Sequence, residues 1–131
     1  MWAYTSIVML MCLCQEAPVK SQMPKQIIGN WCLALDQMTN ETYAYRRGCG
    51  DRIDIMVRID GFDAEETSCD LHKIEHRDAM WLASFRCVGA GLEWVEDDEI
   101  RLTKNGWTLK AMIRNAHRVG DPPRYCLMGM C

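Results

Sequence analysis

The chain has 131 residues, of which 49% are hydrophobic and 25% are charged, and its formal net charge is −3. This length suits one domain with a modest core, and the composition excludes a disordered or collagen-like chain. A general nucleic-acid-binding protein is normally clearly basic, so we expect no nucleic-acid partner. Eight cysteines in so short a chain indicate an oxidising compartment or a metal site.

The first segment predicts an export signal. Residues 3–14 contain no charged side chain, and this run is too short to span a bilayer but suits the central region of a secretory signal. The small residues Val19 and Ser21 favour cleavage before Gln22. We therefore expect a signal peptide over residues 1–21, a periplasmic or secreted location, and no membrane span after cleavage. A lipoprotein, an uncleaved anchor and a buried N-terminal strand remain open as alternatives.

Short apolar and β-branched runs alternate with turn residues along the rest of the chain. In one run, Ile53, Ile55, Val57 and Ile59 fall on the same face, which is the period of a β-strand. No segment is a convincing amphipathic helix. The pattern predicts an all-β antiparallel meander of seven or eight strands, closed as a small barrel or folded as a sandwich. The seven runs are residues 27–35, 42–47, 53–59, 67–74, 80–88, 92–102 and 107–114.

These runs define the expected domain organisation. An N-terminal arm over residues 22–26 precedes a β domain over residues 27–115. An irregular C-terminal tail over residues 116–131 follows, because the alternating pattern stops there and two prolines occur at 122–123.

Four cysteines of the β domain are placed for disulfide bonds. Cys69 and Cys87 lie symmetrically about the predicted turn between them, and so do Cys32 and Cys49. Such positions face each other in an antiparallel hairpin at a distance that a disulfide requires. The C-x₂-C pairs typical of zinc sites do not occur in the sequence. Four cysteines allow three pairings, and we favour Cys32–Cys49 with Cys69–Cys87.

The C-terminal end carries a cluster of sulfur-containing side chains, Cys126, Met128, Met130 and Cys131. Soft ligands of this kind suit Cu(I). A third disulfide between Cys126 and Cys131 explains the same cysteines, and a tail without a role is the remaining alternative.

Other candidate metal ligands have simpler explanations. His72 and His76 belong to an H-x-x-E-H sequence, which binds zinc only on a helix. Here it falls on a strand, where two histidines four residues apart lie about 13 Å from each other, so a solvated strand edge is the favoured interpretation.

Two acidic segments are candidate calcium sites, because carboxylate oxygens are the ligands of this ion. Neither has the spacing of an EF-hand, and we expect solvated acidic loops, the second of which interrupts its strand with a bulge. The segments consist of Asp60, Asp63, Glu65 and Glu66, and of Glu96, Asp97, Asp98 and Glu99.

Several motifs resemble a group of uncharacterised small exported proteins of alpha-proteobacteria. They are a G-x-W-C sequence at residues 29–32, a D-G-F…E-x-x-C sequence over residues 60–69, and the segment 85–91 followed by Trp94. The resemblance covers about residues 28–114 and implies an exported disulfide-containing protein, but it implies no activity.

A weaker resemblance is to calycin barrels, which include lipocalins and bacterial metalloprotease-inhibitor barrels, through the G-x-W opening at residues 29–31. It implies that a basic residue of the last strand, here Arg114, covers Trp31 through a cation–π contact.

The sequence contains no Ser-His-Asp order, phosphate-binding loop or dinucleotide motif. We therefore expect a non-enzymatic binding module without a cofactor, acting on an unknown protein or small-molecule ligand. Two alternatives remain: a calycin-like barrel that binds a small apolar ligand or inhibits a protease through a protruding arm, and a copper-binding protein that uses the C-terminal cluster. The residues expected to form the core or one wall of a cavity are Trp31, Phe85, Trp94 and Trp107.

Overall fold

A computed structural model describes residues 21–120 of the chain. They form two short 3₁₀ helices, η1 (Lys25–Ile27) and η2 (Leu35–Gln37), and eight strands. The strands are β1 (Gly29–Leu33), β2 (Thr42–Arg46), β3 (Ile55–Arg58), β4 (Gly61–Ala64), β5 (Thr67–Arg77), β6 (Met80–Gly89), β7 (Leu92–Leu102) and β8 (Gly106–Arg118). Among these residues, no helix is long and apolar enough to cross a membrane.

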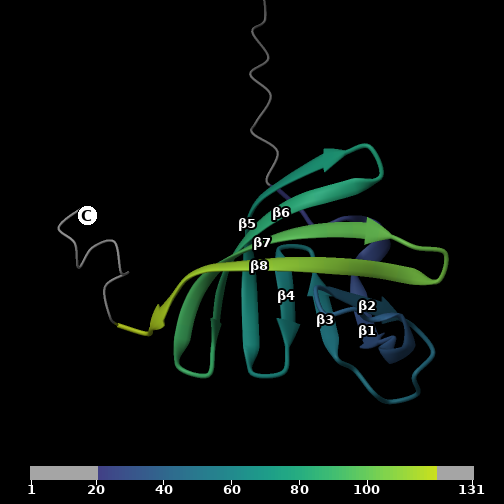
Figure 1. Ribbon diagram of the computed structural model, residues 1–131, viewed down its shortest axis with the longest axis horizontal. Coiled ribbons are helices and arrows are strands. Elements are labelled where there is room, and N and C mark those ends of the chain that lie inside the picture. The colour runs from purple at the N-terminus through teal and green to yellow at the C-terminus, as the bar shows by residue number, and fades with distance from the viewer. Residues whose placement is uncertain (1–20, 121–131) are drawn as a thin grey trace, which may run out of the picture.

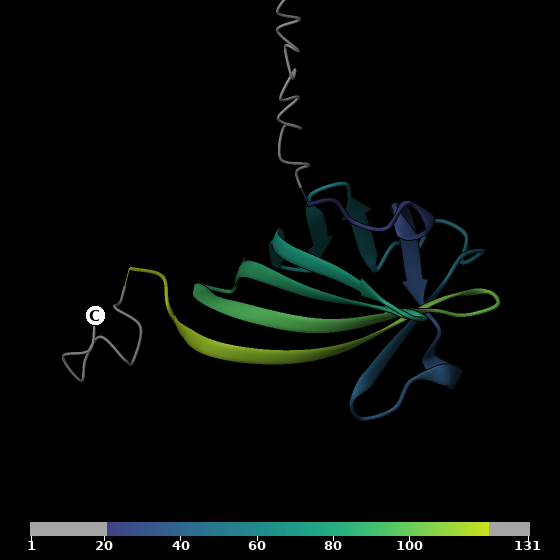
Figure 2. The same ribbon diagram turned by 90° about the horizontal axis from the view of Figure 1, so that it is seen from above.

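The eight strands form a closed antiparallel barrel in the order β1-β2-β8-β7-β6-β5-β4-β3. Closure comes from β1, which pairs with β2 on one side and with β3 on the other. The long strands β5 to β8 run side by side as three successive hairpins, and the short strands complete the barrel (Figures 1 and 2). The predicted all-β meander is confirmed, and its barrel form replaces the sandwich alternative.

The eighth strand comes from a segment that the sequence pattern predicts as a turn. The turn itself includes only Ile59 and Asp60, and Gly61 already begins β4. A side chain at Gly61 would collide with the backbone carbonyl of Cys69 on β5, so glycine permits the two strands to approach. Because glycine and aspartate are typical turn residues, their presence here concealed a strand of four residues.

Two strands extend beyond their predicted ends. β5 continues to Arg77, through residues that the sequence predicts as a turn, and β8 continues to Arg118 rather than ending at Asn115. The last strand therefore ends three residues beyond Asn115. In both places, pairing with the neighbouring strand extends the ladder through polar residues.

The expected bulge at the acidic segment is also wrong. β7 is continuous from Leu92 to Leu102, and it pairs with β6 from Leu92 to Arg101 without a register shift. The register of β7 shifts instead against β8, between Glu93 and Val95, which precede the acidic segment. The four acidic residues therefore alternate between the two faces of a regular strand.

Aromatic residues form much of the barrel core. Trp107 and Phe85 are fully buried, and Trp31 is 6% exposed. The Trp31 and Trp107 rings meet edge to face with centroids 6.2 Å apart, and Phe62 contacts Phe85 in the same way at 5.0 Å. Three of the four predicted aromatic residues are thus core residues, and the fourth, Trp94, is half-buried.

The N-terminal segment packs against the barrel instead of protruding from it. Met23 and Ile27 are buried, the backbone N–H of Met23 donates to Ile59 at 2.8 Å, and Trp31 Nε1 donates to the carbonyl of Ile27 at 2.7 Å. The predicted free arm is therefore corrected: burial of apolar side chains holds this segment over one end of the barrel.

A basic residue does cover Trp31, but it is not Arg114. The guanidinium carbon of Arg47 lies 4.1 Å from the centre of the Trp31 ring. Arg114 lies on the outer face of β8, where its Nε donates to Asp97 Oδ2 at 2.7 Å. The alternation of β8 turns Arg114 away from the interior, so the loop residue Arg47 takes this place.

Both favoured disulfides are present. Cys69 and Cys87 face each other across β5 and β6 with Cα atoms 4.1 Å apart, and Cys32 of β1 is bonded to Cys49 with Cα atoms 6.3 Å apart. The first bond lies within the interior, while the second ties the connection between β2 and β3 to β1.

Candidate functional site

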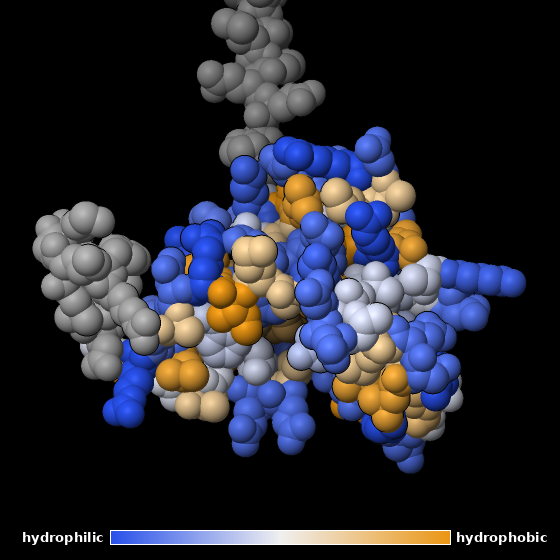
Figure 3. Space-filling model, viewed as in Figure 1, coloured by the Kyte–Doolittle hydropathy of each residue, from blue (hydrophilic) through white to orange (hydrophobic). Residues whose placement is uncertain are grey.

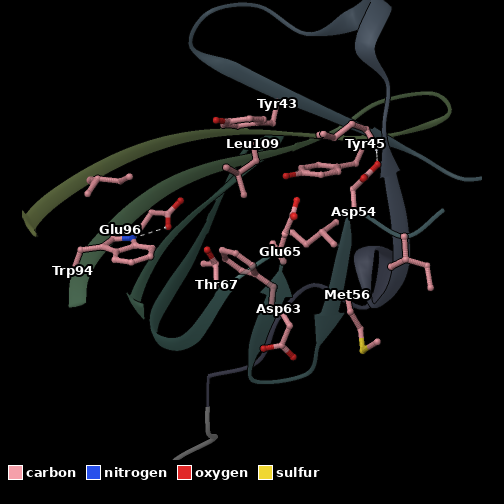
Figure 4. Close-up of a pocket in the computed structure, with 16 residues that line it drawn as sticks. Tyr43, Tyr45, Asp54, Met56, Asp63, Glu65, Thr67, Trp94, Glu96 and Leu109 are labelled. Carbon is pink, nitrogen blue, oxygen red and sulfur yellow. Dashed lines mark hydrogen bonds between the residues drawn. The ribbon is translucent and has the colours of Figure 1, made fainter. Parts of the chain in front are cut away.

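The barrel interior opens into a cavity of about 840 Å³. Its lining comes from every strand except β6, and it includes the aromatic side chains of Tyr43, Tyr45 and Trp94 together with Leu109 and Ile113. Figure 4 shows Trp94 with Glu96 on one side of this space and Tyr45 with Asp54 on the other. The size and aromatic lining match those of small-molecule sites in proteins.

The charges around the cavity have one sign. Among the described residues that line it, four are acidic and none is basic: Asp54, Asp63, Glu65 and Glu96. Asp54 accepts a hydrogen bond from Arg52 at 3.1 Å, and Asp63 accepts one from Arg58 at 2.9 Å.

The other two acidic residues of the lining lack a basic partner. Within residues 21–120, neither Glu65 nor Glu96 takes part in a salt bridge. Glu65 is exposed at the turn between β4 and β5, whereas Glu96 is only 8% exposed.

Glu96 occupies a polar position deep in an apolar wall. Its Oε2 accepts a hydrogen bond from Trp94 Nε1 at 3.2 Å and lies 3.4 Å from the sulfur of Cys87. Burial raises the pKa of the Glu96 carboxyl group, and the hydrogen bond from Trp94 acts in the opposite direction.

Asp98 follows Glu96 on the same interior face of β7 and is 2% exposed. Neither of its carboxyl oxygens accepts a hydrogen bond from a donor group among the described residues, whereas the carboxyl groups of Asp98 and Glu96 share a hydrogen bond when Asp98 is protonated. Burial raises the pKa of Asp98 to about 9, and the charges of Glu96 and Asp97 act in the same direction. At neutral pH this group therefore holds a proton.

Tyr45 lies between the cavity and the aromatic core. Its ring stacks on Trp107 with centroids 4.4 Å apart, and it lines the cavity. Burial raises the pKa of the Tyr45 hydroxyl, and the charges of Tyr43, Asp98 and Glu96 contribute to the same shift. The hydroxyl group consequently stays protonated and is available as a donor.

A second hollow of about 860 Å³ adjoins the first and shares Tyr43, Glu96 and Ile113 with it. It also includes two lysines, Lys73 and Lys110. Both are engaged, because Lys73 contacts Glu75 at 3.6 Å and Lys110 contacts Glu41 at 3.6 Å. The unneutralised charge of this region therefore remains negative.

The outer surface is mixed in character. On the face shown in Figure 3, hydrophobic residues form several patches that hydrophilic residues separate. Four of the large exposed apolar side chains line the cavity: Tyr43, Ile53, Met56 and Ile113. Others, which include Leu35 on η2, Val88 on β6 and Leu102 on β7, lie on separate elements. Scattered exposure of this kind is normal for a protein surface.

The proposed zinc and calcium ligands do not converge. Among residues 21–120, the one group of three potential ligands with neighbouring atoms consists of Cys69, Cys87 and Glu96, and its two cysteines form a disulfide. His72 is exposed on β5, and the His76 ring stacks on Trp81 with centroids 4.3 Å apart.

The first acidic segment is held by a basic side chain rather than arranged around an ion. Arg58 contacts Asp60, Asp63 and Asp70. In the second segment Glu96 and Asp98 are buried, so the expected solvated loop is wrong there.

Sequence reasoning anticipated Trp94 as a cavity residue but missed the acidic interior. The useful signal was the alternation itself: Trp94, Glu96, Asp98 and Ile100 share one face of a strand. The signal peptide and the C-terminal cluster, residues 126–131, lie outside the described residues, so those hypotheses stay predictions.

No model of a protein family matches the chain, and searches of curated proteins and of solved structures find no match either.

Proposed function

We propose that this chain is an exported, non-enzymatic binding protein that takes a small, partly apolar molecule into its barrel. The observation that carries the proposal is the cavity of about 840 Å³, which is lined by Tyr43, Tyr45 and Trp94. Ligand sites in proteins are typically concave, mostly apolar and about 300–1,000 Å³ in volume.

The closed ladder supports this proposal because it holds the cavity walls in place without a ligand. The strands have no open edge, and the Cys69–Cys87 disulfide lies next to Glu96 in the wall. A preformed site loses less conformational entropy on binding than a flexible one.

A small molecule is favoured over a protease as the partner. Inhibition through the N-terminal segment would require a free arm, but Met23 and Ile27 are buried against the barrel. The scattered apolar residues of the outer surface likewise favour the interior as the binding site.

Export is part of the proposal because two disulfides are typical of oxidising compartments. The predicted signal peptide leads to the same compartment.

Titration with N-phenyl-1-naphthylamine, a neutral dye that becomes fluorescent in apolar sites, tests the proposal. We expect saturable binding of one dye molecule per chain. Ala64 lines the cavity, so Ala64→Phe should weaken dye binding roughly tenfold or more by filling the space. Ala79→Phe is the matched control, because Ala79 is exposed in the turn between β5 and β6, and it should bind as the wild type does. Absence of saturable binding to the wild-type protein would contradict the proposal.

A further inference from the structure

We propose that the ligand of the interior cavity is an organic cation, an ammonium group on an apolar body. The cationic head lies against Glu96, where the cavity meets the second hollow that Asp98 lines, and the body lies along Trp94 and Leu109. This inference rests on the proposed function, and it adds the charge of the ligand to it.

The lining supplies the first argument. Its described members include four carboxylates and no basic side chain, and Glu96 reaches the cavity without a salt bridge among residues 21–120. A ligand that enters this space therefore meets a negative potential, which attracts cations and repels anions.

Asp98 supplies an independent argument. Its carboxyl group lies on the interior face between Glu96 and the core residue Ile100, and it is 98% buried. Neither oxygen accepts a hydrogen bond from a described donor group, and the neighbouring carboxyl group of Glu96 is the one hydrogen-bonding group that acts on it within the described residues. Buried polar groups are normally hydrogen-bonded, and an unsatisfied one is costly. Such a group next to the cavity wall provides an acceptor that a bound donor would satisfy.

The apolar lining selects an organic cation over a metal ion. Apart from the disulfide-bonded cysteines with Glu96, no group of three potential metal ligands lies together in the described part of the chain. The aromatic rings of Trp94 and Tyr43 instead suit a substituted ammonium, which binds to π-faces and fills apolar space.

Binding should also release a proton. The pKa of Asp98 is raised to about 9, and a cation beside the carboxyl group favours its ionised form. For a ligand whose charge does not change with pH, affinity should increase from pH 6 to pH 9.

Three probes with the same eight-carbon chain separate charge from apolar contact: octyltrimethylammonium, 1-octanol and octanoate. Each is measured by its displacement of N-phenyl-1-naphthylamine. We expect the cation to bind roughly ten- to a hundredfold more tightly than the alcohol, as charge-assisted contacts in a buried site allow, and octanoate to bind most weakly.

Variants locate the effect. Glu96→Gln should reduce the affinity for octyltrimethylammonium roughly tenfold and leave that for 1-octanol unchanged, and Asp98→Asn should remove the pH dependence. Glu93→Gln is the matched control, since Glu93 lies on the same strand, lines neither the cavity nor the second hollow, and instead contacts His117 at 3.2 Å. Asp98→Asn also serves as the second variant if Glu96→Gln does not fold.

The outcomes distinguish the two proposals. If the dye binds but the alcohol competes as well as the cation, the charge inference is overturned and the binding function stands. The same holds if Glu96→Gln and Asp98→Asn both keep the full preference for the cation. If the wild-type protein binds neither the dye nor any probe, both proposals fall.

Discussion

Asp98 places a carboxyl group inside a hydrophobic barrel, where a charge would cost several kcal/mol without a partner. Its oxygens accept no hydrogen bond from a donor group among the described residues, and burial, together with the neighbouring Glu96 carboxyl group, raises its pKa to about 9. In an unfolded chain an aspartate titrates near about 3.9. The folded state thus binds one proton more than the unfolded state between these two pH values.

This difference fixes the sign of the pH dependence. Where the folded state binds more protons, the free energy of unfolding decreases as the pH rises. We expect the stability of the wild-type protein to decrease from about pH 4 to about pH 9 and then to level off. Asp98→Asn should flatten this slope and exceed the wild-type stability at pH 9 by about 2 kcal/mol or more. Urea unfolding at pH 5, 7 and 9 measures both effects.

Asp97→Asn is the matched control for this prediction. Asp97 lies on the opposite face of β7, and hydrogen bonds from Arg114 and Ser84 lower the pKa of its carboxyl group. Its contribution is present above the unfolded pKa and is lost as the pH falls through the folded pKa. The variant should therefore lose about 0.5 kcal/mol at pH 7, as expected for an exposed pair, and keep the decrease toward pH 9. Equal slopes for the wild type and Asp98→Asn would refute a buried, protonated Asp98.

At the scale of single elements, the two disulfides connect different parts of the barrel. Cys69–Cys87 joins two neighbouring strands from within, and both of its sulfurs are buried. Cys32–Cys49 instead joins β1 to the connection over residues 47–54. The sequence separations are 18 and 17 residues, so the chain-entropy contributions are nearly equal.

We expect each Cys→Ala double variant to lose about 3 kcal/mol of stability in urea unfolding. The Cys69→Ala/Cys87→Ala protein should lose about 1 kcal/mol more, because it also leaves space between buried strands. Hydrogen exchange separates the two variants further. Faster exchange confined to residues 47–54 is expected only when Cys32 and Cys49 are replaced, and the same exchange pattern in both variants would contradict these separate roles.

The elements that could be predicted from the sequence are those with an uninterrupted pattern. Alternation located seven strands, and symmetry about turns located both disulfides, because hairpin geometry converts sequence spacing directly into distance. β4 escaped prediction because Gly61 and Asp63 are typical of turns, and its place depends on contact with β5. Such tertiary contacts have no local signal.

The buried residues Glu96 and Asp98 likewise could not be predicted from the local sequence. A run of four acidic residues ordinarily indicates solvent, but the closed ladder places every second one inside. Similarly, Arg114 matched the calycin pattern in sequence, whereas the outer face of β8 directs it to Asp97 and leaves Trp31 to Arg47. Which face a residue occupies can be predicted only once the phase of its strand is known.

At the scale of the whole molecule, the closed barrel has four short strands and four long strands. The short strands and the N-terminal segment close one end around Trp31 and Trp107, while the long strands β5 to β8 extend beyond them (Figure 1). Ile113 lines the cavity beyond the part of β8 that pairs with β2, and it is 58% exposed. A ligand at this position would restore the burial of that apolar side chain.

The sequence of the whole chain predicts export to an oxidising compartment. If the protein is exported, its cysteines meet oxidising conditions after the signal has been removed. We expect the chain recovered from a bacterial periplasm to begin at Gln22 and to have a mass about 2 Da lower than the reduced form for each disulfide. Mass spectrometry without and with reductant measures both quantities.

A mass difference of two disulfides corresponds to the bonds within the barrel, and a third would indicate Cys126–Cys131. A chain that retains residues 1–21 and carries free thiols at Cys69 and Cys87 would refute export, because those two cysteines face each other and would oxidise in that compartment.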